Sequence, residues 1–122
     1  MYLKGKLIQI GVTPQAEEVI LRLIDRGWFT SEMAAFKAAV AYGLANGIEP
    51  TTGGGLQTKW HVGGIDKTGE FLEVVKMFHE FGENDRPWDY IRRVGDASLK
   101  AIGPRIEYSD VPSDLFVDDQ SQ

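Results

Sequence analysis

Two histidines are the side chains in this sequence whose type suits metal binding. His61 and His79 lie 18 residues apart, and the chain has no cysteine that would add a thiolate ligand. Neither histidine belongs to an H-x-x-H or H-E-x-x-H pattern, which would bring two imidazoles onto one face of a helix. We therefore predict that both are ordinary histidines and that the protein holds no metal or other cofactor.

Paired acidic residues are a second candidate for chemistry, because two carboxylates can act as general acid and general base. The pairs are Glu70 with Glu73 and Asp85 with Asp89, and each stands where a helical pattern begins. Acidic side chains at that place stabilise the positive end of the helix dipole without any catalytic role. No nucleophile elbow, catalytic triad or nucleotide-binding fingerprint accompanies them. We predict that the protein is not an enzyme.

One cluster of basic and aromatic side chains is of the kind that contacts nucleic acid. The cluster consists of Arg86, Arg92 and Arg93 with Trp88 and Tyr90. Helical spacing places Arg86, Tyr90 and Arg93 on one face, where they would hold phosphates or stack on bases. We favour a solvated helix face instead, because nearby carboxylates would neutralise the arginines. These carboxylates are Asp85, Asp89 and Asp96.

The composition is that of one ordinary folded domain. The chain has 122 residues, of which 43% are hydrophobic and 25% charged, and no apolar run approaches the roughly 18 residues that span a membrane. The net charge of −5 comes from residues 106–122, which hold five acidic residues and no basic one. The rest is neutral and lacks the basic field typical of nucleic-acid-binding proteins. The absence of cysteine fits a reducing compartment, so we expect a cytoplasmic protein without a membrane partner.

The first third of the chain predicts a strand followed by two helices. Residues 6–12 alternate between apolar and other side chains, which indicates a short, half-buried strand. Thr13 and Pro14 have the order expected of an N-cap and a first helical residue, and Thr30 or Ser31 caps the second helix. These short elements cannot bury their own apolar faces. We therefore expect them to pack against a second copy of the chain.

The remainder predicts a linker, a helical hairpin and a tail. Residues 50–65 form a Gly-rich linker and loop, because no Lys-Ser/Thr follows the three glycines to make a phosphate-binding loop. Within this segment, residues 59–64 are either a short strand or an ordered loop. Residues 66–105 predict two amphipathic helices packed on the first unit, and residues 106–122 form an acidic tail. The first helix of the hairpin extends to residue 81. Its predicted apolar face is Phe71, Leu72, Val74, Val75, Phe78 and Phe81.

The run IQIGVTP at residues 8–14, the turn GWFTSE at 27–32 and the helix MAAFKAAV at 33–40 resemble the ribbon-helix-helix family of prokaryotic DNA-binding proteins. Members are obligate dimers whose two strands pair antiparallel and enter the major groove, while the second helix grips a phosphate with its N-terminus. The resemblance implies a mainly α fold with one short strand. Residues 1–49 would form the ribbon-helix-helix-like dimerisation unit, followed by the C-terminal helical hairpin.

The resemblance also assigns roles to particular residues. Side chains on the outer strand face would read bases, and among them only Gln9 can form the hydrogen bonds that this requires. The implied DNA-binding residues are Lys4, Lys6, Leu7, Gln9, Gly11, Thr30 and Ser31. The implied dimer core is Ile8, Ile10, Val12, Phe36 and Val40.

Two functions follow from these observations. The first is a homodimeric, ribbon-helix-helix-like protein that binds double-stranded DNA, as a transcription regulator or as an accessory of a DNA-processing system. The alternative is a dimeric protein–protein interaction module that has lost DNA binding, with the acidic tail as a contact for a protein partner. The strand–helix–helix pattern favours the first. Leu7 and Gly11 on the outer strand face, and the neutral body of the chain, favour the second.

Overall fold

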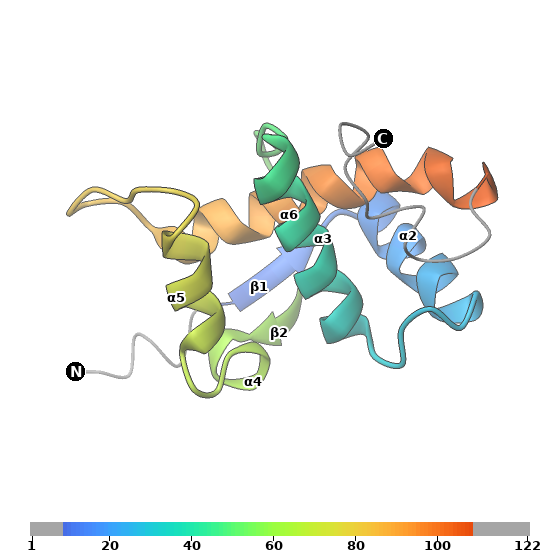
Figure 1. Cartoon of the computed structure of the whole chain (residues 1–122), viewed down its shortest axis with the longest axis horizontal. Helices are drawn as coiled ribbons and strands as arrows, with labels where there is room; N and C mark the ends of the chain where they lie inside the picture. The colour runs from blue at the N-terminus through green and yellow to red at the C-terminus, as the bar shows by residue number, and fades with distance from the viewer. Residues whose placement is uncertain (1–8, 109–122) are drawn as a thin grey trace.

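A computed structural model describes residues 9–108, which are mostly helical with one small sheet (Figure 1). Four of the residues given roles above (Lys4, Lys6, Leu7 and Ile8) and residues 109–122 lie outside the described range. No helix within that range is long and apolar enough to cross a bilayer. The elements are β1 (Gln9–Val12), α2 (Pro14–Asp25), α3 (Glu32–Asn46), β2 (Gln57–His61), α4 (Val62–Ile65), α5 (Glu70–Lys76), α6 (Pro87–Ile102) and the 3-10 helix η1 (Gly103–Tyr108).

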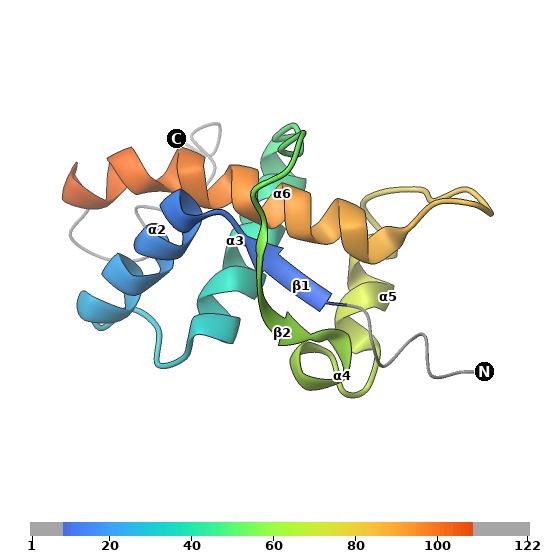
Figure 2. The same cartoon turned by 180° about the vertical axis from the view of Figure 1, so that it is seen from behind.

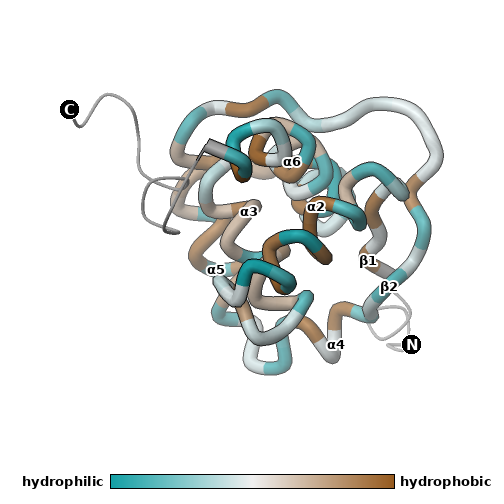
Figure 3. The backbone as a smooth tube through the Cα atoms, turned by 90° about the vertical axis from the view of Figure 1, so that its right-hand side faces the viewer, coloured by the Kyte–Doolittle hydropathy of each residue, from teal (hydrophilic) through white to brown (hydrophobic). Residues whose placement is uncertain are grey.

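The first helix begins and ends where the sequence predicts. The Thr13 hydroxyl accepts a hydrogen bond from the Ala16 amide at 3.3 Å, and Pro14 occupies the first position of α2. Gly27 follows the helix with a φ of 78°, a left-handed conformation that glycine adopts without strain. Hydrophilic and hydrophobic residues alternate along α2 in Figure 3. Four of the apolar residues, Ala16, Val19, Ile20 and Leu23, face the core and are buried, whereas Leu21 is exposed.

The second helix, α3, is capped by Ser31. Its hydroxyl accepts a hydrogen bond from the Ala34 amide at 3.1 Å, whereas Thr30 lies one residue earlier and is exposed. Gly47 ends the helix with a φ of 64°. Of the two cap residues that the sequence left open, the structure selects Ser31.

Two glycines let α3 and α6 approach closely at the centre of the molecule. A Cβ atom on Gly43 of α3 would lie 2.0 Å from the Ser98 Oγ, and one on Gly95 of α6 would lie 2.4 Å from the ring of Phe36. No side chain fits at such distances in a close-packed interior. As a result α6 covers the apolar side of α3, and both Phe36 and Val40 are 0% exposed.

The strand β1 pairs antiparallel with β2 of the same chain (Figures 1 and 2). Gln9 lies opposite His61, and Gly11 lies opposite Thr58. The fold class with one short strand is therefore wrong in its strand count, while the alternative of a short strand within residues 59–64 is confirmed in part by β2. The identity of a strand's partner depends on the whole fold rather than on local sequence.

The four described residues that were assigned to a dimer core are buried within one chain. Ile10 and Val12 of β1 are 0% and 1% exposed, and Phe36 and Val40 of α3 are both 0% exposed. β2 pairs with β1, and α6 packs against both β1 and α3. The chain's own C-terminal half therefore occupies the place that the sequence analysis gave to a second copy.

A bulge in β2 turns two successive side chains toward the helices. Lys59 has no partner residue on β1, so it is the extra residue of the bulge. Successive side chains of a regular strand point to opposite faces, and the bulge breaks this alternation. Lys59 and Trp60 are both partly buried, between the exposed Thr58 and His61. Trp60 packs on Phe36 with ring centroids 5.3 Å apart.

A buried carboxylate, which we call the Asp96 joint, connects three parts of the fold. Asp96 of α6 is 0% exposed. Its Oδ1 accepts hydrogen bonds from the backbone amide and hydroxyl of Thr13, at 2.7 and 2.9 Å. Its Oδ2 accepts from the Thr51 hydroxyl at 2.8 Å and pairs with Lys100 at 3.0 Å. The interpretation of Asp96 as part of a solvated, arginine-neutralising face is wrong, because these partners draw it into the core.

Burial acts against the charged form of Asp96, and its partners act in favour of it. Burial raises the pKa of this carboxyl, while the hydrogen bonds from Thr13 and Thr51 and the contact with Lys100 lower it. The partners have the larger combined effect, so the pKa lies below its ordinary value. Asp96 is therefore a stable, ionised part of the interior.

The first helix of the predicted hairpin is shorter than the sequence indicates. α5 spans only Glu70–Lys76. Asp66 lies before it and accepts hydrogen bonds from two backbone amides of its first turn, at 3.0 and 3.1 Å. Asp85 does not cap α6, because its carboxylate accepts a hydrogen bond from the Gly82 amide instead. Arg86 stands at the N-cap position.

Candidate functional site

Three apolar side chains at the C-terminal end of α5 are exposed, and we call them the α5 patch. Val74 is 49% exposed, Met77 80% and Phe78 60%. Within residues 9–108, Leu21 of α2 is the other large apolar side chain with similar exposure, at 48%. Leu21 lies on a different helix, so the α5 patch is the place where such side chains gather.

The opposite side of α5 attaches it to the body of the protein. Val75 is 1% exposed, and Phe71 lies against Trp88 of α6 with ring centroids 6.2 Å apart. The sequence analysis placed Val74 and Phe78 on this same inward face, and there it is wrong. α5 has apolar residues at 71, 72, 74 and 75. These apolar residues cover more of the helix surface than the single inward face, and the one-face interpretation missed this signal.

Acidic side chains outnumber basic ones in the segment that carries the α5 patch. Glu70, Glu73, Glu80 and Glu83 are all exposed. Among the described residues, Glu73 has an ion-pair partner in Lys76 at 3.5 Å. Residues 66–86 hold six acidic and three basic residues. The segment that carries the patch is therefore net negative.

A groove runs from the α5 patch along the C-terminal end of α3. Its first part is a cavity of about 320 Å³ whose lining includes Phe78, Leu44 and Ile48. Its second part is a cavity of about 660 Å³ that shares Pro50 and Tyr90 with the first.

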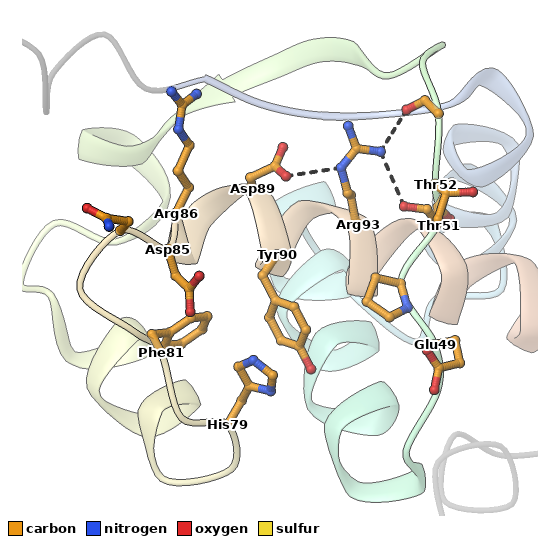
Figure 4. Close-up of a pocket in the computed structure, with 13 residues that line it drawn as sticks. Glu49, Thr51, Thr52, His79, Phe81, Asp85, Arg86, Asp89, Tyr90 and Arg93 are labelled. Carbon is orange, nitrogen blue, oxygen red and sulfur yellow. Dashed lines mark hydrogen bonds and ion pairs between the residues drawn. The ribbon is translucent and has the colours of Figure 1, made fainter.

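The larger cavity has a polar wall formed by α6 (Figure 4). Arg93 donates from Nε to Asp89 at 3.2 Å, and from Nη1 to the carbonyls of Thr51 and Gly53 at 3.2 and 2.7 Å. Asp89 accepts two further hydrogen bonds from Arg92, at 2.9 and 2.7 Å. Burial raises the pKa of Asp89, whereas the two arginines lower it. The effect of the arginines is the larger one, so the pKa lies below its ordinary value. These bonds fix Arg93 within the fold.

Aromatic rings stack beside this wall. His79 lies on Tyr90 with ring centroids 4.0 Å apart, and Phe81 meets them edge-on at 4.7 and 5.5 Å. Figure 4 shows His79 and Phe81 reaching Tyr90 from the connection between α5 and α6. Burial, together with the charge of Glu49, raises the pKa of Tyr90. Packing against Tyr90 and Phe81 therefore accounts for the position of the His79 side chain.

The predicted basic–aromatic cluster is confirmed in part. Arg86, Tyr90 and Arg93 line the same cavity, as their helical spacing indicated. Trp88, at 7% exposure, belongs to the core instead. Of the carboxylates expected to neutralise the arginines, Asp89 contacts both Arg92 and Arg93.

Of the described residues that the resemblance assigned to DNA binding, Gly11 and Ser31 serve local structure. Gly11 is buried against β2, where a Cβ atom would lie 2.2 Å from the Gln57 carbonyl oxygen. Gln9 lies in β1 opposite His61. Ser31 uses its hydroxyl to cap α3, and Thr30 is exposed beside it. None of these residues is basic.

Lys59 is the basic residue of the β1–β2 pair, and the sequence analysis did not single it out. Its ammonium forms ion pairs with Glu17 of α2 and Glu32 of α3, both at 2.8 Å. The hydrogen bonds that Lys59 donates to these two carboxylates raise the pKa of Lys59 above its ordinary value. Because the pairing depends on the bulge, no local pattern in the sequence reveals it. The charge of Lys59 is thereby neutralised inside the protein.

Metal binding finds no support among residues 9–108, where no three metal-ligating side chains gather. Comparison of the chain with protein-family models, curated proteins and solved structures finds no match. The functional argument therefore depends on the arrangement of the residues themselves.

Proposed function

We propose that this protein is an interaction module that binds another protein through the α5 patch. The observation that carries the proposal is the exposure of Met77 (80%) and Phe78 (60%) in a chain that closes its core without them. Contiguous apolar side chains of this kind on a protein surface mark sites of association. Methionine adds an adaptable side chain that fits partners of different shape.

Burial of the patch would contribute to the stability of a transient complex, against the free-energy cost of association. Burying a Met or Phe side chain contributes about 1.5–3 kcal/mol. Two such anchors supply about 3–6 kcal/mol, a large part of the roughly 8 kcal/mol of a micromolar complex. The groove next to Phe78 provides further apolar contact through Leu44 and Ile48.

A pair of variants tests the proposal. Met77→Asp/Phe78→Asp places charge on the patch, while Leu21→Asp makes the same change at an exposed apolar residue of α2. Tagged full-length proteins are expressed in the native host, and co-purified proteins are quantified. We expect one stoichiometric partner with the wild type and with Leu21→Asp, and its loss with the double variant. Retention of the partner by the double variant contradicts the proposal.

DNA binding through the β1–β2 ribbon is a second candidate. The observation that favours it is an antiparallel strand pair with Thr58 and His61 exposed on β2. Figure 2 shows the pair at the front of the molecule, with no described helix across it. Under this candidate, the resemblance to ribbon-helix-helix proteins adds a phosphate contact at the N-terminus of α3 and a homodimer. The neutralised Lys59 weighs against it.

The test of this second candidate is a fluorescence anisotropy titration with duplex DNA at about 50 and about 200 mM salt. Phosphate contacts make protein–DNA affinity fall steeply between these concentrations. The candidate predicts binding at the lower salt that His61→Glu abolishes. Thr68→Glu adds the same charge at an exposed position before α5 and should leave binding intact. Absence of binding at the lower salt rules the candidate out.

A further inference from the structure

The charges around the α5 patch define the chemistry of the surface that it meets. We infer that the patch binds a basic amphipathic helix of another protein, with the apolar stripe of that helix on the patch and its Lys and Arg residues over the acidic rim. The inference rests on the proposed function, because it names the partner of the same site. It follows from three features of the patch: its geometry, its rim and the groove beside it.

The geometry of the patch is a helical stripe. Val74, Met77 and Phe78 occupy positions i, i+3 and i+4, which lie next to one another on a helix surface. Met77 continues the backbone of α5, with φ of −76° and ψ of −17°. A stripe with this spacing packs against the matching stripe of a second helix.

The rim selects the charge of the partner. Glu70 and Glu73 lie on α5 beside the patch, and Glu80 and Glu83 follow it. The side chain of Asp66 is already used as the cap of α5. At the α5 end of the patch, Lys76 pairs with Glu73, and Lys37 and Lys67 line a cavity together with Val74. The acidic excess is therefore greatest at Glu80 and Glu83, where a basic helix is attracted and an acidic helix is repelled.

The groove offers a place for one anchoring side chain. The cavity of about 320 Å³ opens beside Phe78, and its lining combines the apolar Leu44, Ile48 and Pro50 with Glu49, His79 and Tyr90. Apolar anchors that fill such pockets dominate the binding energy of many interfaces. A Leu or Phe at the end of the partner's apolar stripe would fill this cavity.

A second copy of this chain fits the patch poorly. A twofold dimer brings the same surface of both copies together, so the acidic rims containing Glu73 and Glu80 would face each other. The chain as a whole carries a net charge of −5, which adds to the repulsion. A different protein with a basic surface avoids both costs.

Two synthetic peptides of about 16 residues test the inference against the full-length protein. Both carry the same Leu and Phe stripe, with Lys and Arg on the polar face of one peptide and Glu on that of the other. Binding is measured by fluorescence anisotropy at about 150 mM salt. We expect the basic peptide to bind about tenfold more tightly or better, and its affinity to fall as salt is added.

Three protein variants locate the binding. Met77→Asp/Phe78→Asp should abolish binding of the basic peptide. Glu73→Lys/Glu80→Lys should reverse the preference between the two peptides. The matched control makes the same charge change on α2, at two exposed acidic residues, and should keep the preference. This control variant is Glu18→Lys/Asp25→Lys.

The outcomes separate this inference from the proposed function. Equal affinity for both peptides, lost in Met77→Asp/Phe78→Asp, overturns the basic partner and leaves the patch as a docking site. Unchanged peptide affinity in that variant, or no binding of either peptide, also overturns the inference. A concentration-dependent dimer that the same variant abolishes would show that a second copy is the occupant, and would overturn it as well.

Discussion

The Asp96 joint and the α5 patch differ in where their side chains find partners. Asp96 is a charged group with 0% exposure, and Thr13, Thr51 and Lys100 of the same chain surround its carboxylate. Met77 and Phe78 are apolar groups that are 80% and 60% exposed. Burying a charge is unfavourable unless the protein supplies its partners, and exposing apolar side chains is unfavourable unless another molecule covers them.

The contrast assigns stability to one region and binding to the other. The contacts of the joint reach from α6 to the start of α2 and to the segment after α3. The patch lies on a short helix that is fixed to the body by its inward side alone, through Val75 and Phe71. Changes at the joint should therefore alter folding, while changes at the patch should alter association and leave folding intact.

The largest effect is expected at the joint itself. Asp96→Ala leaves the amide of Thr13 and the ammonium of Lys100 without their buried partner, and should lower the free energy of unfolding by about 3–5 kcal/mol. Asp89→Ala removes a carboxylate whose side chain is 40% exposed and should cost about 1 kcal/mol or less. Urea denaturation followed by circular dichroism measures both. Equal losses would remove the distinction between a buried and a surface carboxylate.

The close approach of α3 and α6, which positions Asp96, should give the next largest effect. A Cβ atom on Gly95 would lie 2.4 Å from the ring of Phe36, so Gly95→Ala should destabilise the fold by about 1–3 kcal/mol. Gly54→Ala is the matched control, because nothing lies within 4 Å of the added atom. It should change stability by about 0.5 kcal/mol or less. A neutral Gly95→Ala would show that the helices are not tightly packed there.

Acid should weaken the joint selectively. The pKa of Asp96 in the folded protein is below the value of about 3.9 found in unfolded chains. Its contribution is therefore fully present above that unfolded value and is lost as pH falls through the lower, folded pKa. The effect is smaller than that of Asp96→Ala, since a protonated carboxyl still forms hydrogen bonds.

Asp96→Asn isolates this pH dependence from that of the other carboxylates. Urea midpoints are measured for the wild type and the variant between pH 7 and pH 2. The variant should be less stable at pH 7, and the difference from the wild type should shrink as the solution becomes acidic. A constant difference across this range would contradict the assigned role of the ionised carboxylate.

The contrast also explains which features the sequence predicts. The caps Thr13 and Ser31 are set by bonds to amides three residues away, so local pattern reveals them. Asp96 contacts Thr13 and Thr51 across 83 and 45 residues of sequence, and no local pattern contains that information. For the same reason the sequence assigned Asp96 to the surface.

The ribbon and α5 show two further limits of local pattern. The alternation at residues 9–12 predicts a strand, yet its partner β2 is fixed by a bulge that brings Lys59 to Glu17 and Glu32. In α5, helical periodicity indicates which residues are apolar but not how many sides the fold covers. Helix α6 covers one side only, and this leaves the α5 patch outside.

The smallest effect on stability is expected at the α5 patch. Its size shows whether Met77 and Phe78 belong to the surface or to the core. Met77→Ser/Phe78→Ser should change the free energy of unfolding by about 0.5 kcal/mol or less, because both side chains are mostly in water already. Val75→Ser, on the inward side of the same helix at 1% exposure, should cost about 2 kcal/mol or more. Urea denaturation of the two variants gives the comparison directly. If the double variant were as unstable as Val75→Ser, Met77 and Phe78 would belong to the core, and the proposed docking surface would lose its basis.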